Sequence, residues 1–594
     1  MSDEIKHECA VAMVVLRGPP VATGDFGGTK LSLLMEKQHN RGQDGAGAAV
    51  LSANPVPGEE PYWIAKSASA TPLVDVLASI AKRTSASCSD TGTRKGEKIF
   101  LGHLRYATFG KNEVAFCHPF VHEASELEHT LLLAGNFNLT NVHELFDAYS
   151  RHGSFPTSKA DGYLICEMIA HELAQEHGGA RASPIVTALS TALANADGAW
   201  TLCGATGDGW SFATRDPHGI RPGFYYVSDD VVAVASERPA IQAAFDVAPE
   251  AVKELPPGQV LVISPNGDVS FKSLVQSNDV TPCVFERIYF SRANDADIHR
   301  ERKALGAALV PSVLKAAGEP MENIFFSYIP NSSRVAFHGL LEELFGKVLT
   351  RRHRDTERAR TRSEAPASEI FCDSEPPSLF VESLPRFGEV AVKDAKFRTF
   401  IADAAARREF YKHVYDVTYG LVRPGKDALV VLDDSIVRGN TMKNAILPML
   451  DRLGPKRIVI ASSAPPIRYP DCYGIDMSTL GELVAFRALV KLLGENANDI
   501  LRNALAGGAK NPLAALYARF TEERHAAEIA RLLAPPGIHA EVTVVYQTVA
   551  ALHVACPGSS GDWYFTGNYP TQGGYKVLRR ALMNYLDENS ERSY

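Results

Sequence analysis

The chain has 594 residues, of which 45% are apolar, so it can build several hydrophobic cores and two or more domains are expected. Its formal net charge of -8 offers no general positive field to a phosphate backbone, which disfavours DNA or RNA as the main partner. The first residues are polar and no apolar run is long enough to cross a bilayer. The sequence therefore predicts a soluble, cytoplasmic protein with no membrane partner.

The nine cysteines are spread singly along the chain, without a Cys-x-x-Cys pair. This spacing argues against a zinc ribbon and against a disulfide framework, and most of the thiols are expected to be small buried side chains. Cys9 differs from the others because it directly precedes the apolar run AVAMVVL near the N-terminus.

Residues 9–270 alternate short apolar runs with glycine-rich turns. Strand-like runs include KIFLGHLRYATFG, HTLLLAGNFNLTN and DVVAVASE, and helical patterns include KLSLLMEKQH and YLICEMIAHELAQ. This mixture of two-residue and 3.6-residue periods predicts an α+β domain built on packed sheets.

From about residue 280 the pattern changes to strands that are followed by helices. ALVVL and RIVIASSA are predicted strands, and the helical segment between them completes a βαβ unit, which implies a parallel sheet. We expect an α/β domain over residues 280–500, and a C-terminal α/β extension over residues 501–594. The predicted helix has five apolar residues on one face: Met442, Ile446, Met449, Leu450 and Leu453.

Two adjacent carboxylates, Asp433 and Asp434, end the strand ALVVL. Parallel sheets bind ligands beyond the carboxyl ends of their strands, where helix N-termini offer free N–H groups to a phosphate. A sugar phosphate would satisfy both features, because its hydroxyls can donate to carboxylates while its phosphate sits in the following turn. The alternative is an N-capping aspartate in an ordinary strand–helix connection, which explains one acid better than two.

The segment VVLDDSIVRGNT resembles the phosphoribosyl diphosphate (PRPP) signature of type I phosphoribosyltransferases, and APPIRYPDCYGIDM resembles the segment that follows it in the amidophosphoribosyltransferase family. The resemblance implies that Asp433 and Asp434 hold the ribose hydroxyls and Mg²⁺, a hard cation suited to oxygen ligands. Asn440 stands where threonine is usual and keeps the hydrogen-bonding capacity. The resemblance implies PRPP contacts throughout the turn: Ser435, Arg438, Gly439, Asn440 and Thr441.

Two further segments extend this resemblance. Ser333 in YIPNSSRVAFHG matches a metal-site position. VKDAKFRTF resembles the flexible loop that closes over PRPP and is one residue shorter than usual, so Lys393 and Arg398 are expected diphosphate contacts. Closure would shield an oxocarbenium-like C1 from water.

The first half resembles the class II glutamine amidotransferases. Their motifs occur in the expected order as QHNRGQDGAG, LGHLRYATFG, GNFNLTN, SKADGY and RDPHGIRP. In that family an N-terminal cysteine attacks the glutamine amide with its own α-amine as general base, a role suited to an α-amine pKa of about 7.7–8.0. The resemblance implies an Ntn-hydrolase fold, an αββα sandwich, with Cys9 as the nucleophile.

The same resemblance assigns the other pocket residues. Arg105 would clamp the glutamine α-carboxylate with its guanidinium, and Asp161 would pair with the α-ammonium. Asn136 and the backbone N–H of Phe137 would form the oxyanion hole. Two more residues would line the pocket: Arg41 and Thr108.

Two positions depart from the amidotransferase pattern. Phe137 stands where the oxyanion motif usually has glycine, which excludes backbone conformations that only glycine tolerates, although a backbone donor survives any side chain. Ala10 follows Cys9 where glycine is common. Because residues 1–8 precede Cys9 and end in KHE, which resembles a short acidic propeptide, cleavage after Glu8 is expected to free the α-amine.

Some relatives hold an iron–sulfur cluster through four cysteines. Here Cys283 matches one ligand position, Cys472 lies one residue from another, and the C-terminal Cys-x-x-Cys is absent. No cluster is expected, since a cluster needs all its thiolates.

Together the halves predict a bifunctional enzyme that hydrolyses glutamine and passes ammonia to C1 of PRPP, giving 5-phosphoribosylamine, glutamate and diphosphate. The resemblance further implies the first step of de novo purine synthesis, inhibition by purine nucleotides, and a homo-oligomer. Phe137 and the short loop leave two alternatives open: a degenerate homologue that senses PRPP or nucleotides, and an ammonia-only transferase with an inactive glutaminase. A hexosamine synthase is not expected, because its second half would lack LDDSIVRGNT.

Overall fold

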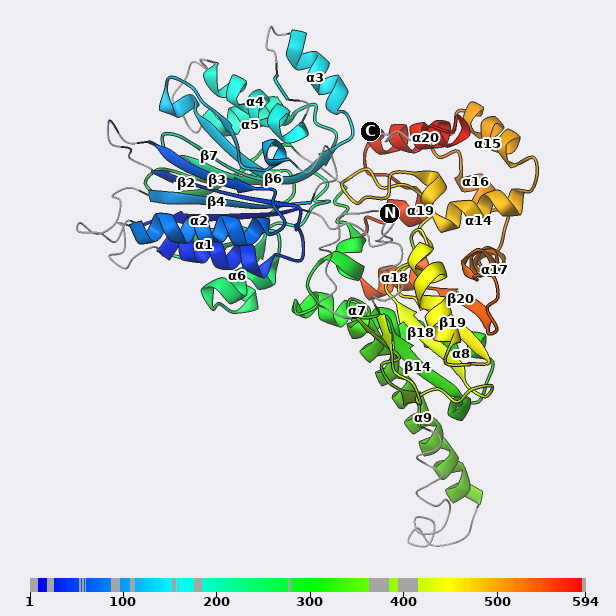
Figure 1. The fold of residues 1–594 in the computed structure, drawn as a ribbon. Helices are drawn as coiled ribbons and strands as arrows, with labels where there is room; N and C mark the ends of the chain where they lie inside the picture. Colours follow the sequence, from blue (N-terminus) through cyan, green and yellow to red (C-terminus); the bar gives the residue numbers. More distant parts are fainter. Residues whose placement is uncertain are drawn as a thin grey trace.

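The computed structural model describes residues 9–18, 26–52, 55, 58, 60–86, 97–106, 113–151, 156–158, 160–175, 184–275, 279–362, 384–393 and 415–589. The expected cleavage site, Thr108 and Arg398 lie outside these residues, and Lys393 is described by its backbone alone. Figure 1 shows a sandwich of sheets and helices beside a second, parallel-sheet half.

The first half contains two antiparallel sheets. The seven-stranded sheet has the order β11 (Lys253–Glu254), β9 (Phe224–Val227), β10 (Val231–Ala235), β1 (Ala10–Leu16), β4 (Glu97–Arg105), β2 (Gly45–Ser52) and β3 (Tyr62–Ser67). The six-stranded sheet has the order β13 (Val269–Ser273), β12 (Gln259–Ile263), β8 (Ser211–Arg215), β7 (Gly198–Thr206), β6 (Leu131–Leu139) and β5 (Phe120–His122).

Helices cover the outer face of each sheet (Figure 1). The seven-stranded sheet packs against α1 (Phe26–Lys37), α2 (Pro72–Ala86) and α6 (Arg238–Phe245). The six-stranded sheet packs against α3 (Val142–Arg151), α4 (Asp161–Ala174) and α5 (Pro184–Leu193). The predicted αββα sandwich is confirmed.

Strand β1 explains why the sequence after Cys9 is apolar without alternation. Val11, Met13 and Val15 face the core between the two sheets, whereas Ala12 and Val14 face the outer core with α1. A strand that is buried on both faces needs apolar residues at every position, so its two-residue period disappears from the sequence.

The second half contains a five-stranded parallel sheet in the order β15 (Arg386–Phe387), β14 (Ile324–Tyr328), β18 (Ala428–Asp433), β19 (Arg457–Ser462) and β20 (Glu541–Tyr546). On one face lie α8 (Val310–Ala317) and α9 (Arg334–Arg362), and α7 (Ala296–Ala308) packs against α9. On the other lie a π-helical turn, η7 (Met442–Ile446), α13 (Leu447–Asp451), α14 (Val484–Leu493) and α17 (Glu522–Leu533). The five apolar residues predicted on one helical face all lie in this second core.

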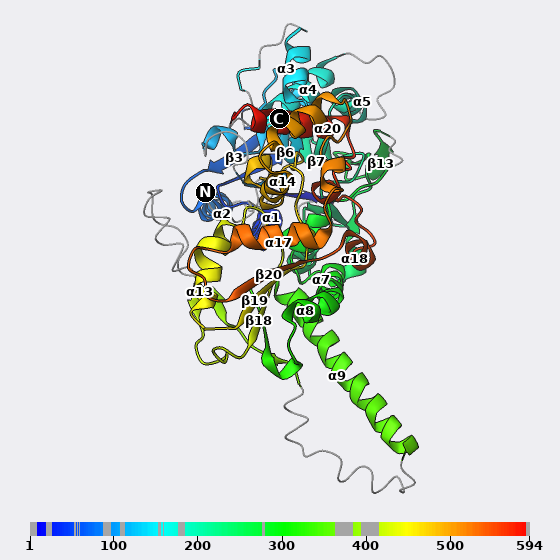
Figure 2. The same cartoon turned by 90° about the vertical axis from the view of Figure 1, so that its right-hand side faces the viewer.

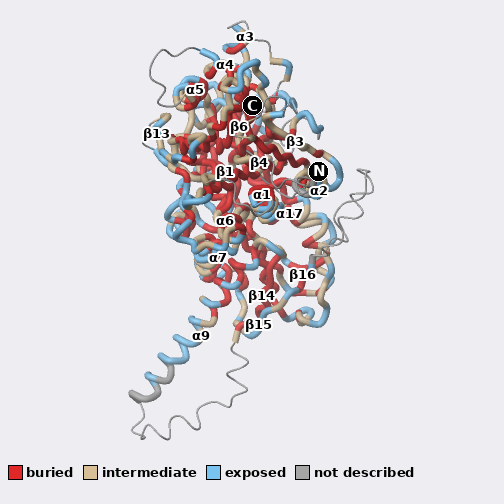
Figure 3. The backbone as a smooth tube through the Cα atoms, turned by 90° about the vertical axis from the view of Figure 1, so that its left-hand side faces the viewer, coloured by how far each residue is buried: buried red, intermediate tan, exposed pale blue. Residues whose placement is uncertain are grey.

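Two features lie outside this layered body. A small antiparallel pair, β16 (Ala391–Lys393) and β17 (Tyr415–Val417), forms a separate sheet. Helix α9 projects away from the layered body (Figure 2). Its described side chains over residues 351–354 are exposed (Figure 3). Among the described helices, none is both long and apolar enough to cross a membrane.

The C-terminal residues are part of the second half and do not form the separate extension that the sequence predicted after residue 500. Strand β20 pairs with β19 over six residues, so a boundary at residue 500 would divide one sheet. The long segment between the two strands explains the error, because no local pattern reports which distant strands pair. The remaining helices are α15 (Ala497–Ala506), α16 (Ala514–Tyr517), α18 (Val549–Ala555), α19 (Trp563–Thr566) and α20 (Gln572–Leu586).

This C-terminal segment also joins the two halves. Asp197 of the sandwich accepts the N–H of Gly573 at 2.9 Å at the start of α20. Within the second half, Trp563 donates to the buried carboxylate of Asp471 at 2.7 Å, next to Cys472. Asn138 donates from the sandwich to the Cys472 carbonyl at 2.6 Å. The relative placement of the halves is therefore fixed by buried polar contacts.

Two candidate active sites and the junction between them

Cys9 lies immediately before β1, one residue beyond the Ala10–Leu104 pair of strands β1 and β4. Its Sγ accepts the N–H of Tyr106 at 3.3 Å. Burial raises the pKa of the thiol to about 11, while the nearby Arg105 opposes this and Asp161 reinforces it. A thiol with this pKa is protonated at neutral pH, so nucleophilic attack requires a base beside it.

Arg105 and Asp161 reach the thiol from different elements. Arg105 ends β4 and is buried, with its guanidinium 5.6 Å from the centre of the Phe116 ring. Asp161 is the first residue of α4, and its Oδ1 accepts the N–H of Gly162 at 2.9 Å. Burial raises the pKa of Asp161 to about 6, and Arg105 lowers it in part. One thiol, one cation and one carboxylate thus influence one another inside the sandwich.

Asn136 and Phe137 are neighbours on β6. Asn136 is buried, and its Nδ2 has no hydrogen-bond partner among the described residues. Among the described residues other than glycine, only Asp246 and Glu588 have a positive φ, so Phe137 has an ordinary strand backbone. The replacement of glycine by Phe137 therefore places no strain on the backbone. We call Cys9, Arg105, Asn136, Phe137 and Asp161 the thiol site.

Arg41 lies apart from these contacts, at the junction of the halves. Its guanidinium is fully buried and contacts Glu237 of the sandwich at 2.7 Å. It also contacts both oxygens of Glu286, at 3.0 and 2.6 Å, and Ser291 at 3.2 Å, in the first segment of the second half. Its contacts thus hold the two halves together, whereas the sequence placed Arg41 in the wall of the glutamine pocket.

The second site is a cavity of about 630 Å³ at the carboxyl ends of β14 and β18. Asp433, Asp434 and most of the expected turn residues line it, namely Ser435, Arg438, Gly439 and Thr441. His39 and Asn40 of the first half complete the wall. We call this the acid-pair cavity, and it spans the junction between the halves.

The charge of Asp434 affects the ionisation of Asp433. Burial raises the pKa of Asp433 well above its usual range, and the neighbouring Asp434 raises it further. Burial also raises the pKa of Asp434, although this carboxylate accepts the Ser332 hydroxyl and the N–H of Ser435 at 2.7 Å. Asp433 is half-buried and Asp434 is buried, and two adjacent carboxylates with raised pKa values are suited to bind hydroxyl donors or a cation, which would relieve their repulsion.

The turn after Asp434 needs glycine at one position. Gly439 has a φ of 76°, and a Cβ there would overlap Leu533. Arg438 donates to Glu482 at 2.7 Å and to the Asp476 carbonyl at 3.1 Å, so its guanidinium has protein partners. Asn440 is exposed and is not among the residues that line the cavity.

Two residues near the acid pair were not identified from the sequence. Ser332 contacts Asp434, whereas the expected metal-site residue Ser333 donates its hydroxyl to the Ile329 carbonyl. Arg302 is buried in the cavity wall and donates to the carbonyls of Arg287 at 2.8 Å and Ser291 at 2.7 Å. Its charge lowers the pKa of Asp434. The motif YIPNSSRVAFHG indicated a serine near the acid pair, but its spacing does not tell whether the hydroxyl of Ser332 or that of Ser333 faces Asp434.

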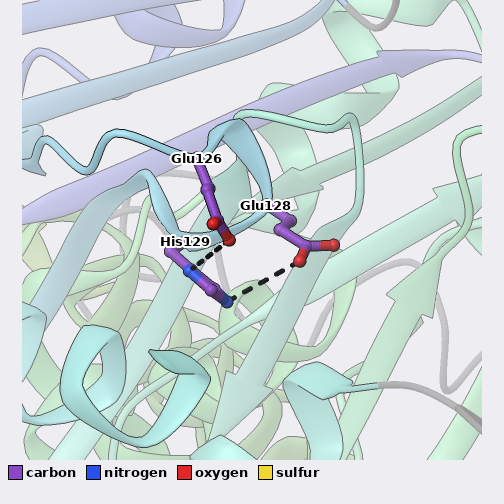
Figure 4. Close-up of side chains that lie close together, drawn as sticks. All are labelled: Glu126, Glu128 and His129. Carbon is purple, nitrogen blue, oxygen red and sulfur yellow. Dashed lines mark ion pairs between the residues drawn. The ribbon is translucent and has the colours of Figure 1, made fainter. Parts of the chain in front are cut away.

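Among the described residues, one group of three His, Cys, Asp or Glu side chains has its possible ligand atoms close together: Glu126, Glu128 and His129 (Figure 4). His129 lies 3.3 Å from Glu126 and 3.8 Å from Glu128, and all three are partly or fully exposed. Exposed pairs of this kind are common surface ion pairs, and they are distinct from the predicted magnesium ligands.

The fold and the two sites define a class. An Ntn-hydrolase-type sandwich with a half-buried thiol before its first strand is joined to a phosphoribosyltransferase-type parallel sheet with an acid pair over a cavity. No protein-family model matches the chain. The chain is nevertheless similar to proteins named amidophosphoribosyltransferase.

Three such relatives come from distant organisms. The protein of Archaeoglobus fulgidus is 26% identical over 402 residues, covering 67% of this chain and 75% of that protein. The protein of Pseudomonas aeruginosa is 27% identical over 406 residues, covering 65% and 70%. The mouse protein is 27% identical over 420 residues, covering 67% and 71%.

Two solved structures have a similar fold over nearly the whole chain. Glutamine PRPP amidotransferase from B. subtilis, complexed with ADP and GMP, matches with a TM-score of 0.64 at 22% identity, covering 95% of this chain and 97% of that one. A structure described as the allosteric regulatory enzyme of purine biosynthesis also gives 0.64, at 22% identity, and covers 95% and 96%. The predicted fold class and the family resemblance are confirmed.

Proposed function

We propose that the protein is an amidophosphoribosyltransferase. Glutamine is hydrolysed at Cys9, and the ammonia displaces diphosphate from C1 of PRPP to give 5-phosphoribosylamine and glutamate. The observation that carries the proposal is the acid-pair cavity, because His39 and Asn40 of the thiol-bearing half line it together with Asp433 and Asp434. Ammonia made in the thiol-bearing half would therefore meet PRPP at a cavity that both halves line.

In the glutaminase half, Cys9 attacks the side-chain amide carbon of glutamine. Burial keeps the thiol protonated, which supports the need for the α-amine that cleavage after Glu8 would release. Arg105 binds the α-carboxylate and Asp161 binds the α-ammonium, while Thr108 lines the pocket. The unpartnered Nδ2 of Asn136 and the N–H of Phe137 stabilise the oxyanion.

In the transferase half, Asp433 and Asp434 accept the ribose hydroxyls, and the turn from Ser435 to Thr441 binds the 5-phosphate. The donor set also fits Mg²⁺, because two adjacent carboxylates, with the Ser332 hydroxyl beside Asp434, offer hard oxygen ligands. Bound Mg²⁺ would neutralise charge on the departing diphosphate. Lys393 and Arg398 contact the diphosphate, and no iron–sulfur cluster is required.

The comparison also supports a proposal on regulation. The B. subtilis structure is complexed with ADP and GMP, and we infer that purine nucleotides inhibit this protein as well. We further infer a homo-oligomer in the cytoplasm that performs the first step of de novo purine synthesis.

A substrate panel tests the function. Purified protein should release glutamate from glutamine, and release of diphosphate from PRPP should require Mg²⁺ together with glutamine or ammonium. Intact mass should show a chain that begins at Cys9. Support by ammonium but not by glutamine would leave an ammonia-only transferase, and binding of PRPP without any turnover would leave a sensor.

A further inference from the structure

Strand β5, the outer neighbour of β6, ends just before the proposed oxyanion residues Asn136 and Phe137. The described pairing of β5 with β6 ends at Phe120–Leu133. Backbone groups of alternate residues in a strand point to opposite edges, so Leu133, Gly135 and Phe137 point to the same edge. At Gly135 and Phe137 this edge lies past the end of β5, and buried backbone groups there need other partners.

Two histidines replace the missing strand at Gly135. The Gly135 N–H donates to Nδ1 of His118 at 3.1 Å, and the Gly135 carbonyl accepts from Nε2 of His103 at 3.1 Å. The two rings are stacked, with centroids 4.0 Å apart and planes within 9°. We call this pair the histidine clamp.

The backbone of Gly135 fixes the tautomers of the clamp. A carbonyl only accepts, so His103 carries its proton on Nε2, and an N–H only donates, so Nδ1 of His118 is unprotonated. Burial lowers the pKa of His103 to about 3 and that of His118 well below its usual range. Both rings are therefore neutral at physiological pH and hold Gly135 in one arrangement.

The ring of Phe137 fits the space that two glycines leave. A Cβ on Gly135 would lie 2.7 Å from Cδ1 of Phe137, and a Cβ on Gly162 would lie 2.8 Å from its Cζ. The ring also packs near His118, with centroids 5.6 Å apart. Phe137 thus fills a slot between β6 and the start of α4, beside Asp161.

We propose that the histidine clamp and the Phe137 ring form one positioning unit for the oxyanion hole. By fixing Gly135, the clamp sets the direction of the next two residues, so that the Asn136 amide and the Phe137 N–H point together at the amide oxygen of glutamine. His103 and His118 are positioning residues, because they act through Gly135 and not on the substrate. This inference rests on the proposed glutaminase activity.

His118→Leu and His118→Gln test the unit in the full-length chain. Leucine removes the acceptor for the Gly135 N–H, whereas the glutamine amide oxygen restores one. We expect His118→Leu to lower kcat for glutamine roughly 10–100-fold, since misplacing oxyanion donors is costly, with KM for glutamine little changed. His118→Gln should recover most of kcat, and ammonium-dependent turnover of PRPP should be unchanged in both variants.

Several results would contradict the proposal that the histidine clamp and the Phe137 ring form a positioning unit. One is an unchanged kcat for glutamine in His118→Leu, and another is a fall in His118→Gln equal to that in His118→Leu. If His118→Leu loses ammonium-dependent turnover as well, the same comparison is made with His103→Leu and His103→Gln, and loss of both activities in both leucine variants would assign the histidines to folding. A wild-type chain that does not hydrolyse glutamine would instead overturn the proposed function, and with it the role of the clamp.

Discussion

The thiol site and the acid-pair cavity have opposite electrostatic requirements. At the thiol site, burial holds a proton on Cys9, and the chemistry needs a base that removes it. At the cavity, burial and mutual repulsion favour protons on Asp433 and Asp434, and the chemistry needs a cation or hydroxyl donors that keep these carboxylates charged. The thiol site therefore needs a base, and the acid-pair cavity needs a cation or hydroxyl donors.

The sites also differ in how they are built. The thiol site lies within one sandwich, on strands and a helix start that form a rigid frame. The cavity is shared by turns of the second half and by His39 and Asn40 of the first. Substitutions at the thiol site should therefore remove one activity, whereas substitutions at the cavity or the junction should affect the coupling of both.

The largest expected effect is at Cys9. Cys9→Ala removes the nucleophile and should lower glutamine-dependent turnover about 10⁴-fold or more, as expected for loss of a nucleophile that works with its base as one unit. Ammonium-dependent formation of diphosphate from PRPP should persist. Cys203→Ala, which removes a buried thiol from the core between the sheets, is the matched control and should keep both activities. Loss of the ammonium-dependent reaction in Cys9→Ala would contradict the separation of the two sites.

Asp434→Asn tests the other half of the comparison. Removal of one charge from the acid pair should lower PRPP-dependent turnover with either nitrogen source, by roughly 10²–10³-fold if the carboxylate stabilises charge in the transition state. The Mg²⁺ concentration for half-maximal diphosphate release should rise, while hydrolysis of glutamine itself continues. Asp268→Asn, at an exposed turn of the sandwich, should leave all three measurements unchanged. An unaltered Mg²⁺ response in Asp434→Asn would remove this residue from the metal site.

The sequence predicted those elements whose signals are local. The buried strand β1, the βαβ unit with its apolar helix face, and the acids at the end of β18 all follow from contiguous patterns. It did not predict contacts between distant segments, such as β20 beside β19 or the partners of Arg41. Spacing also favoured Ser333, whereas the hydroxyl beside Asp434 belongs to Ser332, because a loop motif does not fix the direction of each side chain.

Substitution of Arg41 at the junction of the two halves should lower the stability of the protein. Arg41→Ala would leave Glu237 and Glu286 buried without their main cation, and breaking a buried pair in this way costs about 3–5 kcal/mol. Arg300→Ala breaks an exposed pair with Asp297, which is worth about 0–1 kcal/mol. Thermal unfolding should show a clear fall of the midpoint for Arg41→Ala and almost none for Arg300→Ala. Equal midpoints would mean that the buried network does not join the halves.

A comparison of Gly439 with Gly425 distinguishes the effect of backbone strain from that of steric overlap in the turn after Asp434. Gly439 and Gly425 both have positive φ, at 76° and 68°, but a Cβ on Gly439 would overlap Leu533, whereas one on Gly425 meets no atom within 4 Å. Gly425→Ala should cost about 1–2 kcal/mol of stability from backbone strain alone. Gly439→Ala should cost more and should raise KM for PRPP severalfold, because the turn that we propose to bind the 5-phosphate must shift. A raised KM in Gly425→Ala as well would show that strain, not local shape, is responsible.

At neutral pH the smallest expected effect is that of a pH dependence, which appears only below about pH 6 and distinguishes the two sites. Burial raises the pKa of Asp161 to about 6, so this carboxylate gains its proton as the pH falls through that value. If the charged form binds the glutamine α-ammonium, KM for glutamine should rise below pH 6 by up to about tenfold per pH unit, because one proton is linked to binding. KM for ammonium, corrected for its own ionisation, should not follow the same curve. In Asp161→Asn, KM for glutamine should be high at every pH and show no inflection near 6, whereas an inflection that survives this substitution would assign the titration to another group.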